Sequence, residues 1–299
     1  MNKDVKLKLL AFESFGVRSM STFVETPDLK ILIDPGVAIA PERFSLPPTK
    51  AEFAELKKRR DLIQEHGKKA DVIVISHYHY DHYTPFLDNI YCASSPGIAK
   101  ELYKDKIILT KHPTMNINKS QEQRSANFLL NVKNIAKEVK FNDAKTFEFG
   151  DTKIEFSPPV PHGLENSKLG YVTMTNIRYQ DYSIIHASDI QGPIVEKTLD
   201  WIIEKNPNIL ILSGPPLYLL WKFGKKRVEL AEKNLEKIID QCSIDKIILD
   251  HHVLRDAKYM EKMPIFSLNE ITTAAKFHNL ENNLLEVKRK EIFEKENKS

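Results

Sequence analysis

Short apolar runs recur along most of the chain and predict β-strands, because each has the length and composition of a buried strand. The predicted strands are residues 7–12, 21–25, 30–33, 71–76, 106–109, 146–149, 153–156, 171–175, 182–185, 208–212 and 246–249. Turn-forming sequences separate several of them, such as Asp34-Pro35-Gly36 and Gly150-Asp151.

Charged segments with helical periodicity lie between these strands. The predicted helices are residues 49–66, 120–139, 193–205, 225–241, 268–277 and 282–295. Pro47-Pro48 supply a start signal for the first, and Ser120 is expected to cap the second. Hairpins mixed with strand–helix alternation predict an α/β sandwich in one domain over residues 1–299, with a helical insertion near 119–140 and a charged C-terminal helix near 282–299.

Side chains that can bind metal follow five of these runs. They are Asp34, His77, His162, Asp189 and His251. Because ligands gather at the carboxyl ends of strands in sheets covered by helices, we expect these side chains to meet at one sheet edge. Their convergence is stronger evidence for a site than any one motif.

The densest part of this set is His77-Tyr78-His79-Tyr80-Asp81-His82, directly after an apolar strand. Only 10 of the 299 residues are His, so three within six positions indicate a function. Imidazole and carboxylate together suit zinc, iron or manganese. His77 and His79 can converge on one ion, and Asp81 and His82 can hold a second. The sequence therefore predicts a metal-dependent enzyme.

These residues and their order resemble the metallo-β-lactamase superfamily. The similar positions are His77-x-His79-x-Asp81-His82, then His162, Asp189 and His251, with Asp34 upstream. The sequences of residues 13–20 and 249–252 resemble a branch of this superfamily known mainly from archaea. That resemblance does not indicate a substrate. The resemblance implies an αββα sandwich of two mixed sheets covered by helices. It also implies two divalent metal ions in a groove at one sheet edge, and zinc is the first choice for these ions.

The resemblance also implies a role for each residue. His77, His79 and His162 would bind the first metal, and Asp81, His82 and His251 the second. Asp189 would bridge the two ions, so that Asp81 and Asp189 are the catalytic carboxylates. Asp34 would accept a hydrogen bond from a ligating histidine, although a plain turn is the alternative.

His251 and His252 compete for one ligand position. Adjacent strand side chains point to opposite faces, so only one of the two is expected to bind metal. His251 is favoured because it lies nearer the strand end and fits the superfamily position. His252 would then support a ligand or face the substrate.

The leading hypothesis is a dinuclear hydrolase with a metal-bridging hydroxide as nucleophile and a phosphodiester or phosphorylated small molecule as substrate. A lactonase or thioesterase, a nuclease, an iron redox protein and a structural metal protein are the alternatives. Nucleases of the superfamily often carry an RNA-binding insertion, and the 120–140 insertion here is too short for a full extra domain. Iron redox relatives usually have Glu in place of the second histidine of the motif, whereas this chain has His79. Arg18, Arg124 and Arg255 are candidates to bind an anionic group of the substrate. For each one taken alone, a solvent-exposed surface position without a function is the default interpretation.

Composition changes this picture little. The net charge of +3, from 44 basic and 41 acidic residues, does not by itself favour binding to nucleic acid or to a membrane. Cys92 and Cys242 are expected to be reduced thiols. With no signal-peptide pattern and no apolar run that spans a bilayer, the sequence predicts a soluble, cytoplasmic protein. It does not indicate the oligomeric state.

Overall fold

The first of two mixed sheets is built from the N-terminal half of the chain. We describe a computed structural model over residues 3–296. In spatial order, the sheet consists of β1 (Lys6–Phe12), β2 (Met20–Glu25), β3 (Lys30–Ile33), β4 (Val72–Ile75), β5 (Ile107–Thr110) and β6 (Glu138–Phe141). The pairs β1–β2 and β2–β3 are antiparallel, whereas β3 to β6 run parallel. The carboxyl ends of β3 and β4 therefore lie next to each other.

The second sheet comes from the C-terminal half. In spatial order, it consists of β15 (Ile271–Thr272), β14 (Lys246–Asp250), β13 (Ile209–Ser213), β12 (Tyr182–Ala187), β11 (Thr175–Tyr179), β8 (Thr152–Phe156) and β7 (Thr146–Phe149). Strands β12 to β15 run parallel, and the other pairs are antiparallel. A separate two-stranded ribbon pairs β9 (Val160–Pro161) with β10 (Tyr171–Val172).

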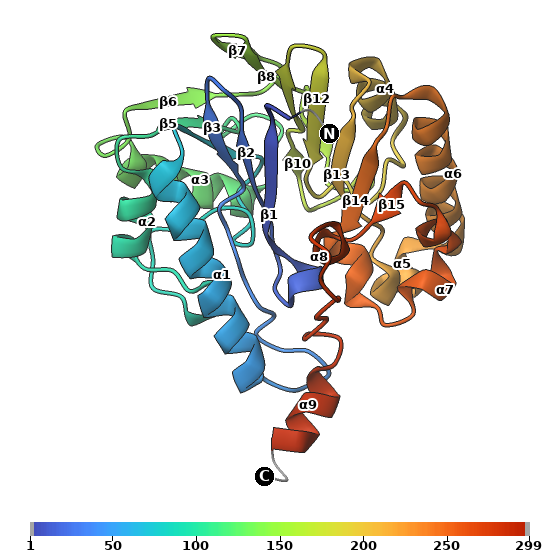
Figure 1. Cartoon of the computed structure of the whole chain (residues 1–299). Helices are drawn as coiled ribbons and strands as arrows, with labels where there is room; N and C mark the ends of the chain where they lie inside the picture. Colours follow the sequence, from blue (N-terminus) through green and yellow to red (C-terminus); the bar gives the residue numbers. More distant parts are fainter. Residues whose placement is uncertain (1–2, 297–299) are drawn as a thin grey trace.

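The two sheets pack face to face, and helices cover their outer surfaces (Figure 1). The helices beside the first sheet are α1 (Lys50–Lys69), α2 (Pro96–Tyr103) and α3 (Lys119–Val132), and those beside the second are α4 (Glu196–Lys205) and α6 (Lys225–Gln241). In β3, Ile31 and Ile33 join the core between the sheets, while Leu32 joins the core under α1. Both faces of the central strands are thus buried, which explains their continuous apolar sequences.

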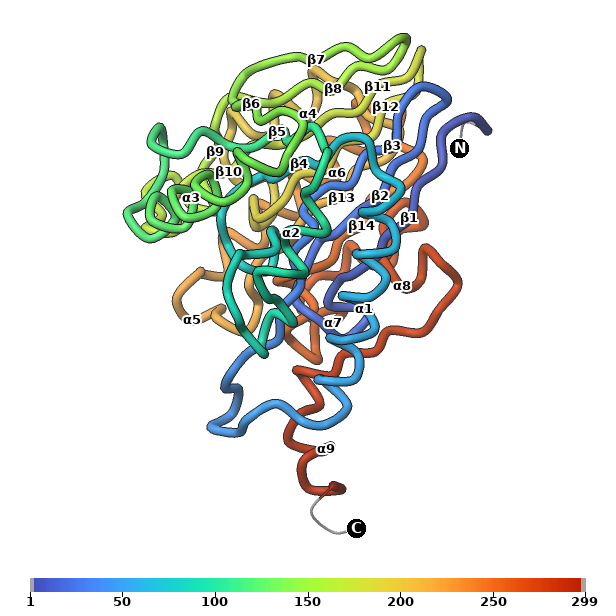
Figure 2. Tube along the Cα trace, turned by 90° about the vertical axis from the view of Figure 1, so that its left-hand side faces the viewer, coloured from blue at the N-terminus to red at the C-terminus, as the bar shows by residue number. Residues whose placement is uncertain are grey.

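Buried hydrogen bonds join the start of α1 to the C-terminal segment. Thr49 and Glu52 form a capping box at the first turn of α1. Arg289 is fully buried and donates to the Glu52 carboxylate from Nε and Nη2, at 2.9 and 2.7 Å. Both views show the last helix, α9 (Arg289–Glu296), projecting beyond this end of α1 (Figures 1 and 2).

Every predicted strand overlaps an observed one, but the predicted 171–175 strand is divided between β10 and the first residue of β11, and three predicted helices differ from the structure. The predicted 120–139 helix ends at Val132, and residues 138–141 form β6 instead, because they pair beside β5. Its N-cap is Asn118 rather than Ser120. The 119–140 insertion therefore consists of helix α3 and a short connection that leads into β6.

The other two errors lie near the C-terminus. Residues 268–277 contain β15 and only a four-residue helix, α8 (Ala274–Phe277), since residues 271–272 extend the sheet beside β14. The predicted helix over 282–299 begins only at Arg289, because buried contacts fix residues 284–286 in an irregular path. Residues 297–299 of that prediction lie outside the described residues.

Several short elements were not predicted at all. They are α2, β9, and the one-turn helices α5 (Leu220–Phe223) and α7 (Tyr259–Lys262). Of β11, only the first residue was predicted. Cys92 and Cys242 are free thiols, as expected. Within residues 3–296, no helix has both the length and the apolar character needed to cross a membrane.

Candidate metal centre

The predicted metal-binding side chains lie where strands end. Asp34 follows β3, His77 begins two residues after β4, His162 follows β9, Asp189 lies two residues after β12 and His251 follows β14. Three of them have left-handed backbones, with φ of 47° at Asp34, 53° at Asp189 and 59° at His251. Such conformations are uncommon outside glycine and cluster at functional sites.

The first cluster of ligand atoms surrounds one oxygen of Asp189. His162 Nε2 lies 2.8 Å from Asp189 Oδ2, His77 Nε2 lies 3.3 Å away, and His79 Nδ1 lies 3.9 Å away. His77 and His79 approach each other to 3.0 Å between Nε2 and Nδ1. The ligand atoms of these four residues all lie within 4.8 Å of one another, a grouping that can hold a cation.

A second cluster also adjoins Asp189. It contains Asp81, His82 and His251. Asp81 Oδ2 lies 3.9 Å from His82 Nε2 and 3.7 Å from His251 Nε2. Asp189 reaches this group as well, with Oδ2 3.3 Å from His82 Nε2 and Oδ1 3.1 Å from His251 Nε2. The seven residues therefore form two adjacent groups that share one carboxylate.

His251 and His252 both turn toward Asp189, so the argument from opposite strand faces does not apply. β14 ends at Asp250, and residues 251–255 form a 3₁₀ helix, in which neighbouring side chains need not point apart. His252 Nε2 lies 3.8 Å from Asp189 Oδ1, farther than His251 Nε2 at 3.1 Å. Only His251 groups with Asp81 and His82. The ligand assignment of His251 stays a prediction that this geometry favours.

Hydrogen bonds from neighbouring side chains orient three of the imidazoles. Asp34 Oδ2 accepts from His82 Nδ1 at 2.9 Å, and Ser76 Oγ lies 2.9 Å from His77 Nδ1. Each bond occupies the ring nitrogen that faces away from Asp189. This arrangement fixes the tautomer and leaves Nε2 for a cation.

Glu13 orients the imidazole of His251 in the same way, and the sequence analysis missed this residue. Its Oε2 lies 2.6 Å from His251 Nδ1, and both groups are buried. Glu13 directly follows β1, so the strand-end rule that selected Asp34 would have selected it too. Two glutamines were also missed: Gln121 Nε2 lies 3.3 Å from His79 Nε2, and Gln191 Nε2 lies 3.4 Å from His162 Nδ1.

Gly36 allows the two loops of the site to touch. A Cβ at this position would lie 2.4 Å from the His82 backbone nitrogen and 2.3 Å from that of Tyr83. No side chain fits at such distances, so the Asp34-Pro35-Gly36 turn can rest against the 77–82 loop only with glycine here. This contact brings Asp34 within reach of His82.

The electrostatics of the site suit cation binding. Burial holds the pKa of His77 well below its usual value and lowers the pKa of His79, so both rings are neutral near pH 7. Burial opposes ionisation of Asp189, but His82 and the other histidines outweigh it and hold its pKa well below the usual range. Burial likewise opposes a charged His251, yet Glu13 raises the pKa of His251 to about 9. A cation at the second cluster must therefore displace a proton from that ring.

Two buried atoms in the second cluster lack hydrogen bonds among the described residues. They are His82 Nε2 and Asp189 Oδ1. Buried polar atoms are rarely left unsatisfied, and each exception needs a cause. A divalent cation between them would supply the missing partner, so the residues present fit the group that the superfamily implies.

Comparison with known proteins places the chain in a family. It is 50% identical over 288 residues to the UPF0282 protein of Methanocaldococcus jannaschii, covering 96% of each chain. It is 52% identical over 290 residues to the UPF0282 protein of Pyrococcus furiosus, covering 97% of this chain and 92% of that one. The chain belongs to the UPF0282 family. These relatives are archaeal, in agreement with the branch that the sequence resembles.

The superfamily is confirmed independently. A family model described as the metallo-beta-lactamase superfamily matches residues 15–86, which include Asp34 and the whole 77–82 motif. The metallo-beta-lactamase fold protein YhfI of Bacillus subtilis is structurally similar, with a TM-score of 0.51, 13% identity, and coverage of 90% of this chain and 97% of that one. At that identity the likeness shows the fold alone. The UPF0282 chain thus has a metallo-β-lactamase, hydrolase-like fold with candidate metal-binding clusters of His and Asp.

Proposed function

We propose that the chain is a dinuclear metal-dependent hydrolase that acts on a phosphodiester or on a phosphorylated small molecule. The observation that carries the proposal is the position of Asp189 between the two clusters. Its Oδ2 lies 2.8 Å from His162 Nε2, and its Oδ1 lies 3.1 Å from His251 Nε2. Oδ2 also lies 3.3 Å from His82 Nε2, so this carboxylate contacts imidazoles of both clusters and is suited to bridge two cations.

Imidazole and carboxylate donors fit zinc, which we take as the first choice, and also fit iron and manganese. When bound, a pair of such ions acidifies water to supply the nucleophile and polarises the bond to be cleaved. Asp81 adds a second carboxylate, so the seven ligands carry two negative charges against four positive ones. The centre would keep a net positive charge, which favours an anionic substrate.

The chain's own side chains keep the ligands in place. Ser76 holds the His77 ring, Asp34 holds His82 and Glu13 holds His251, each through Nδ1. Asp34 and Ser76 are fully buried and Glu13 nearly so, which protects these bonds from water. A preorganised ligand set requires little rearrangement when ions bind.

Elemental analysis of protein purified with metal present tests the dinuclear part. We expect about two equivalents of zinc, iron or manganese per chain, since seven ligands exceed one tetrahedral site. A stoichiometry near zero after metal-replete purification would refute the proposal. One equivalent would reduce it to a mononuclear centre.

A screen of generic phosphodiesters, phosphomonoesters and lactones tests the substrate class. On any substrate found, His77→Ala and Asp189→Ala should abolish turnover and lower metal content, while the fold is retained in circular dichroism. His66→Ala is the matched control, because His66 is also buried but lies on α1 against Phe23. Wild-type turnover in either site variant would show that the catalytic assignment is wrong.

A further inference from the structure

Arg255 is a buried arginine next to the second cluster. It is the last residue of the 3₁₀ helix that begins at His251, and its side chain is 5% exposed. Its Nη2 lies 3.3 Å from His251 Nε2 and 3.9 Å from Asp81 Oδ2. The guanidinium therefore lies beside the atoms that we assign to the second metal.

Glu13 fixes the orientation of this arginine. Its Oε1 accepts a hydrogen bond from Arg255 Nε at 2.6 Å, while its Oε2 contacts His251 Nδ1 at 2.6 Å. One carboxylate thus positions both a candidate metal ligand and a guanidinium. The pair is buried, with 5% and 6% of the side chains exposed, so the geometry is well constrained.

The far edge of the Arg255 guanidinium needs an acceptor. Nε is satisfied by Glu13, and among residues 3–296 Nη1 has no hydrogen bond. Nη2 contacts only His251 Nε2 within hydrogen-bond distance. His251 Nε2 cannot accept a hydrogen bond from Nη2 when it carries a proton, nor when its lone pair binds a metal. Neither amino group then has an acceptor among the described residues, and Nη2 lies beside the metal-binding atoms.

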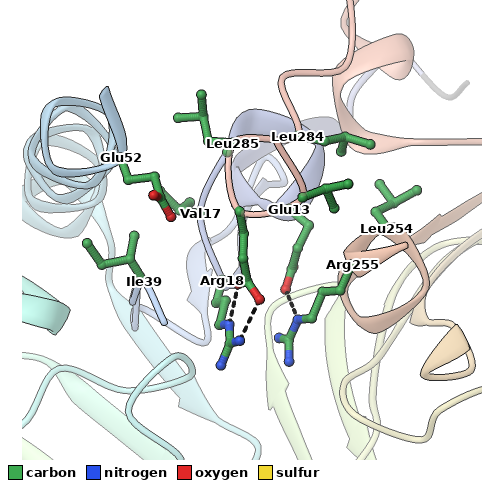
Figure 3. Close-up of a pocket in the computed structure, with 12 residues that line it drawn as sticks. Glu13, Val17, Arg18, Ile39, Glu52, Leu254, Arg255, Leu284 and Leu285 are labelled. Atoms are coloured by element: carbon green, nitrogen blue, oxygen red, sulfur yellow. Dashed lines mark hydrogen bonds and ion pairs between the residues drawn. The ribbon is translucent and has the colours of Figure 1, made fainter. Parts of the chain in front are cut away.

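Two more arginines share a second carboxylate, Glu286, in this region. Arg18 donates from Nε and Nη2 to Glu286, both at 2.7 Å, and Arg43 Nε lies 3.8 Å from the same carboxylate. With Asp81, which lies 3.9 Å from Arg255 Nη2, three carboxylates lie among these three guanidinium groups, so bound cations rather than the arginines alone would supply the positive charge for an anion. In Figure 3, the guanidinium groups of Arg18 and Arg255 point toward the same end of the pocket, away from the leucines that line it.

We propose that Arg255 binds a phosphoryl group of the substrate, whose oxygens lie between the guanidinium and the second metal cluster. This inference rests on the proposed function and deepens it, because it assigns the anionic group of the substrate to one residue. The planar fork of arginine matches two oxygens of a phosphoryl group, which a lysine ammonium does not. An anion between the two positive centres also offsets their repulsion. Glu13 is a positioning residue in this arrangement.

The test measures binding of inorganic phosphate to zinc-loaded protein by isothermal titration calorimetry, with zinc content determined for each sample. We expect Arg255→Gln to weaken phosphate binding roughly tenfold or more, since a charge-assisted pair of hydrogen bonds is lost. Arg255→Lys, which retains the charge beside Glu13, should also lose most of the affinity, because its single ammonium remains on Glu13. It decides the matter if the Gln variant does not fold.

Arg59→Gln is the matched control. Arg59 is similarly buried, with an 11% exposed side chain, and its Nε also donates to a glutamate, Glu55, at 2.6 Å. Phosphate affinity should be unchanged in this variant. Acetate, a planar anion of lower charge, should bind wild type more weakly than phosphate and lose less in the Arg255 variants.

The outcomes separate this inference from the proposed function. Two equivalents of zinc with equal phosphate affinity in wild type and Arg255→Lys would overturn the anion site and leave the metal centre standing. Equal losses in the Arg255 and Arg59 variants would also overturn it. No zinc in wild type would refute both.

Discussion

Replacing Asp34 by Asn should weaken the second metal more than the first. Asp34 Oδ2 accepts from His82 Nδ1 at 2.9 Å and from Ser76 Oγ at 2.7 Å, while Oδ1 accepts from the Ser76 backbone N–H at 2.8 Å. An asparagine keeps the Oδ1 bond and places an amide NH₂ where Oδ2 was. That group cannot accept from His82, so the ring loses the partner that orients it.

The size of the effect follows from what remains around His82. Loss of a hydrogen bond that orients a metal ligand typically costs 10- to 100-fold in metal affinity, or about 1.4 to 2.7 kcal/mol. Ser188 Oγ lies 3.0 Å from His82 Nδ1 and can accept in place of Asp34. We therefore expect a loss nearer tenfold. The backbone adds no penalty, because Asn tolerates the left-handed φ of 47° at this position.

A zinc titration against a chromophoric chelator measures the two affinities. Asp71→Asn is the control, since Asp71 also accepts a backbone N–H, from Lys30 at 2.9 Å, at the far end of the same strand pair. The reasoning is refuted if Asp34→Asn keeps the second zinc within twofold of wild type, or if Asp71→Asn loses as much.

Three further predictions concern the metal ligands, the nucleophile and the C-terminal segment. His251→Ala should weaken the second metal more than His252→Ala in a metal titration, and equal or reversed losses would move the ligand role to His252. The kcat/KM should rise through neutral pH and then level off with metal in excess, because the nucleophile is water acidified by metal to a pKa of about 7; a flat profile from acid to neutral pH would contradict this. Burial opposes ionisation of Glu286, but Arg18 outweighs it and lowers the pKa of Glu286 from its ordinary 4.5 to about 2. This pair therefore stabilises the fold above about pH 4.5 by about 3 kcal/mol, and the contribution is lost as pH falls toward 2. Glu286→Gln should lower the Tm at pH 6 and flatten its decline below pH 4.5; a Tm and slope like those of wild type would exclude this role.

The strands were predictable because the sheets bury both of their faces. In β3 and β4 every residue except Lys30 is buried, so the apolar runs mark the strands without ambiguity. The C-terminal third was harder. β15 has two residues and α8 has four, and tertiary contacts rather than local sequence determine them. Ala274, for example, donates its backbone N–H to Asp250 Oδ2 at 2.9 Å.

The site was predictable as far as strand ends mark it. Asp34, His77 and Asp189 each follow an apolar strand, and the structure brings them together. The relation between His251 and His252 was not predictable, because it depends on a 3₁₀ helix that the sequence does not signal. Glu13 also follows a strand and could have been selected by the same rule, but its partner His251, 238 residues away, was not predictable from the local sequence.

The two halves of the chain meet at this site, which explains why so many of its contacts are distant in sequence. The first sheet supplies the 77–82 motif, while the ribbon and second sheet supply His162, Asp189 and His251. Glu13 joins His251 across 238 residues. Neither half can form a complete cluster alone, so cations at the clusters would connect the two sheets. Because such ions would bind the native state and not the separated halves, they would stabilise the packing of the sheets along with the geometry of the site.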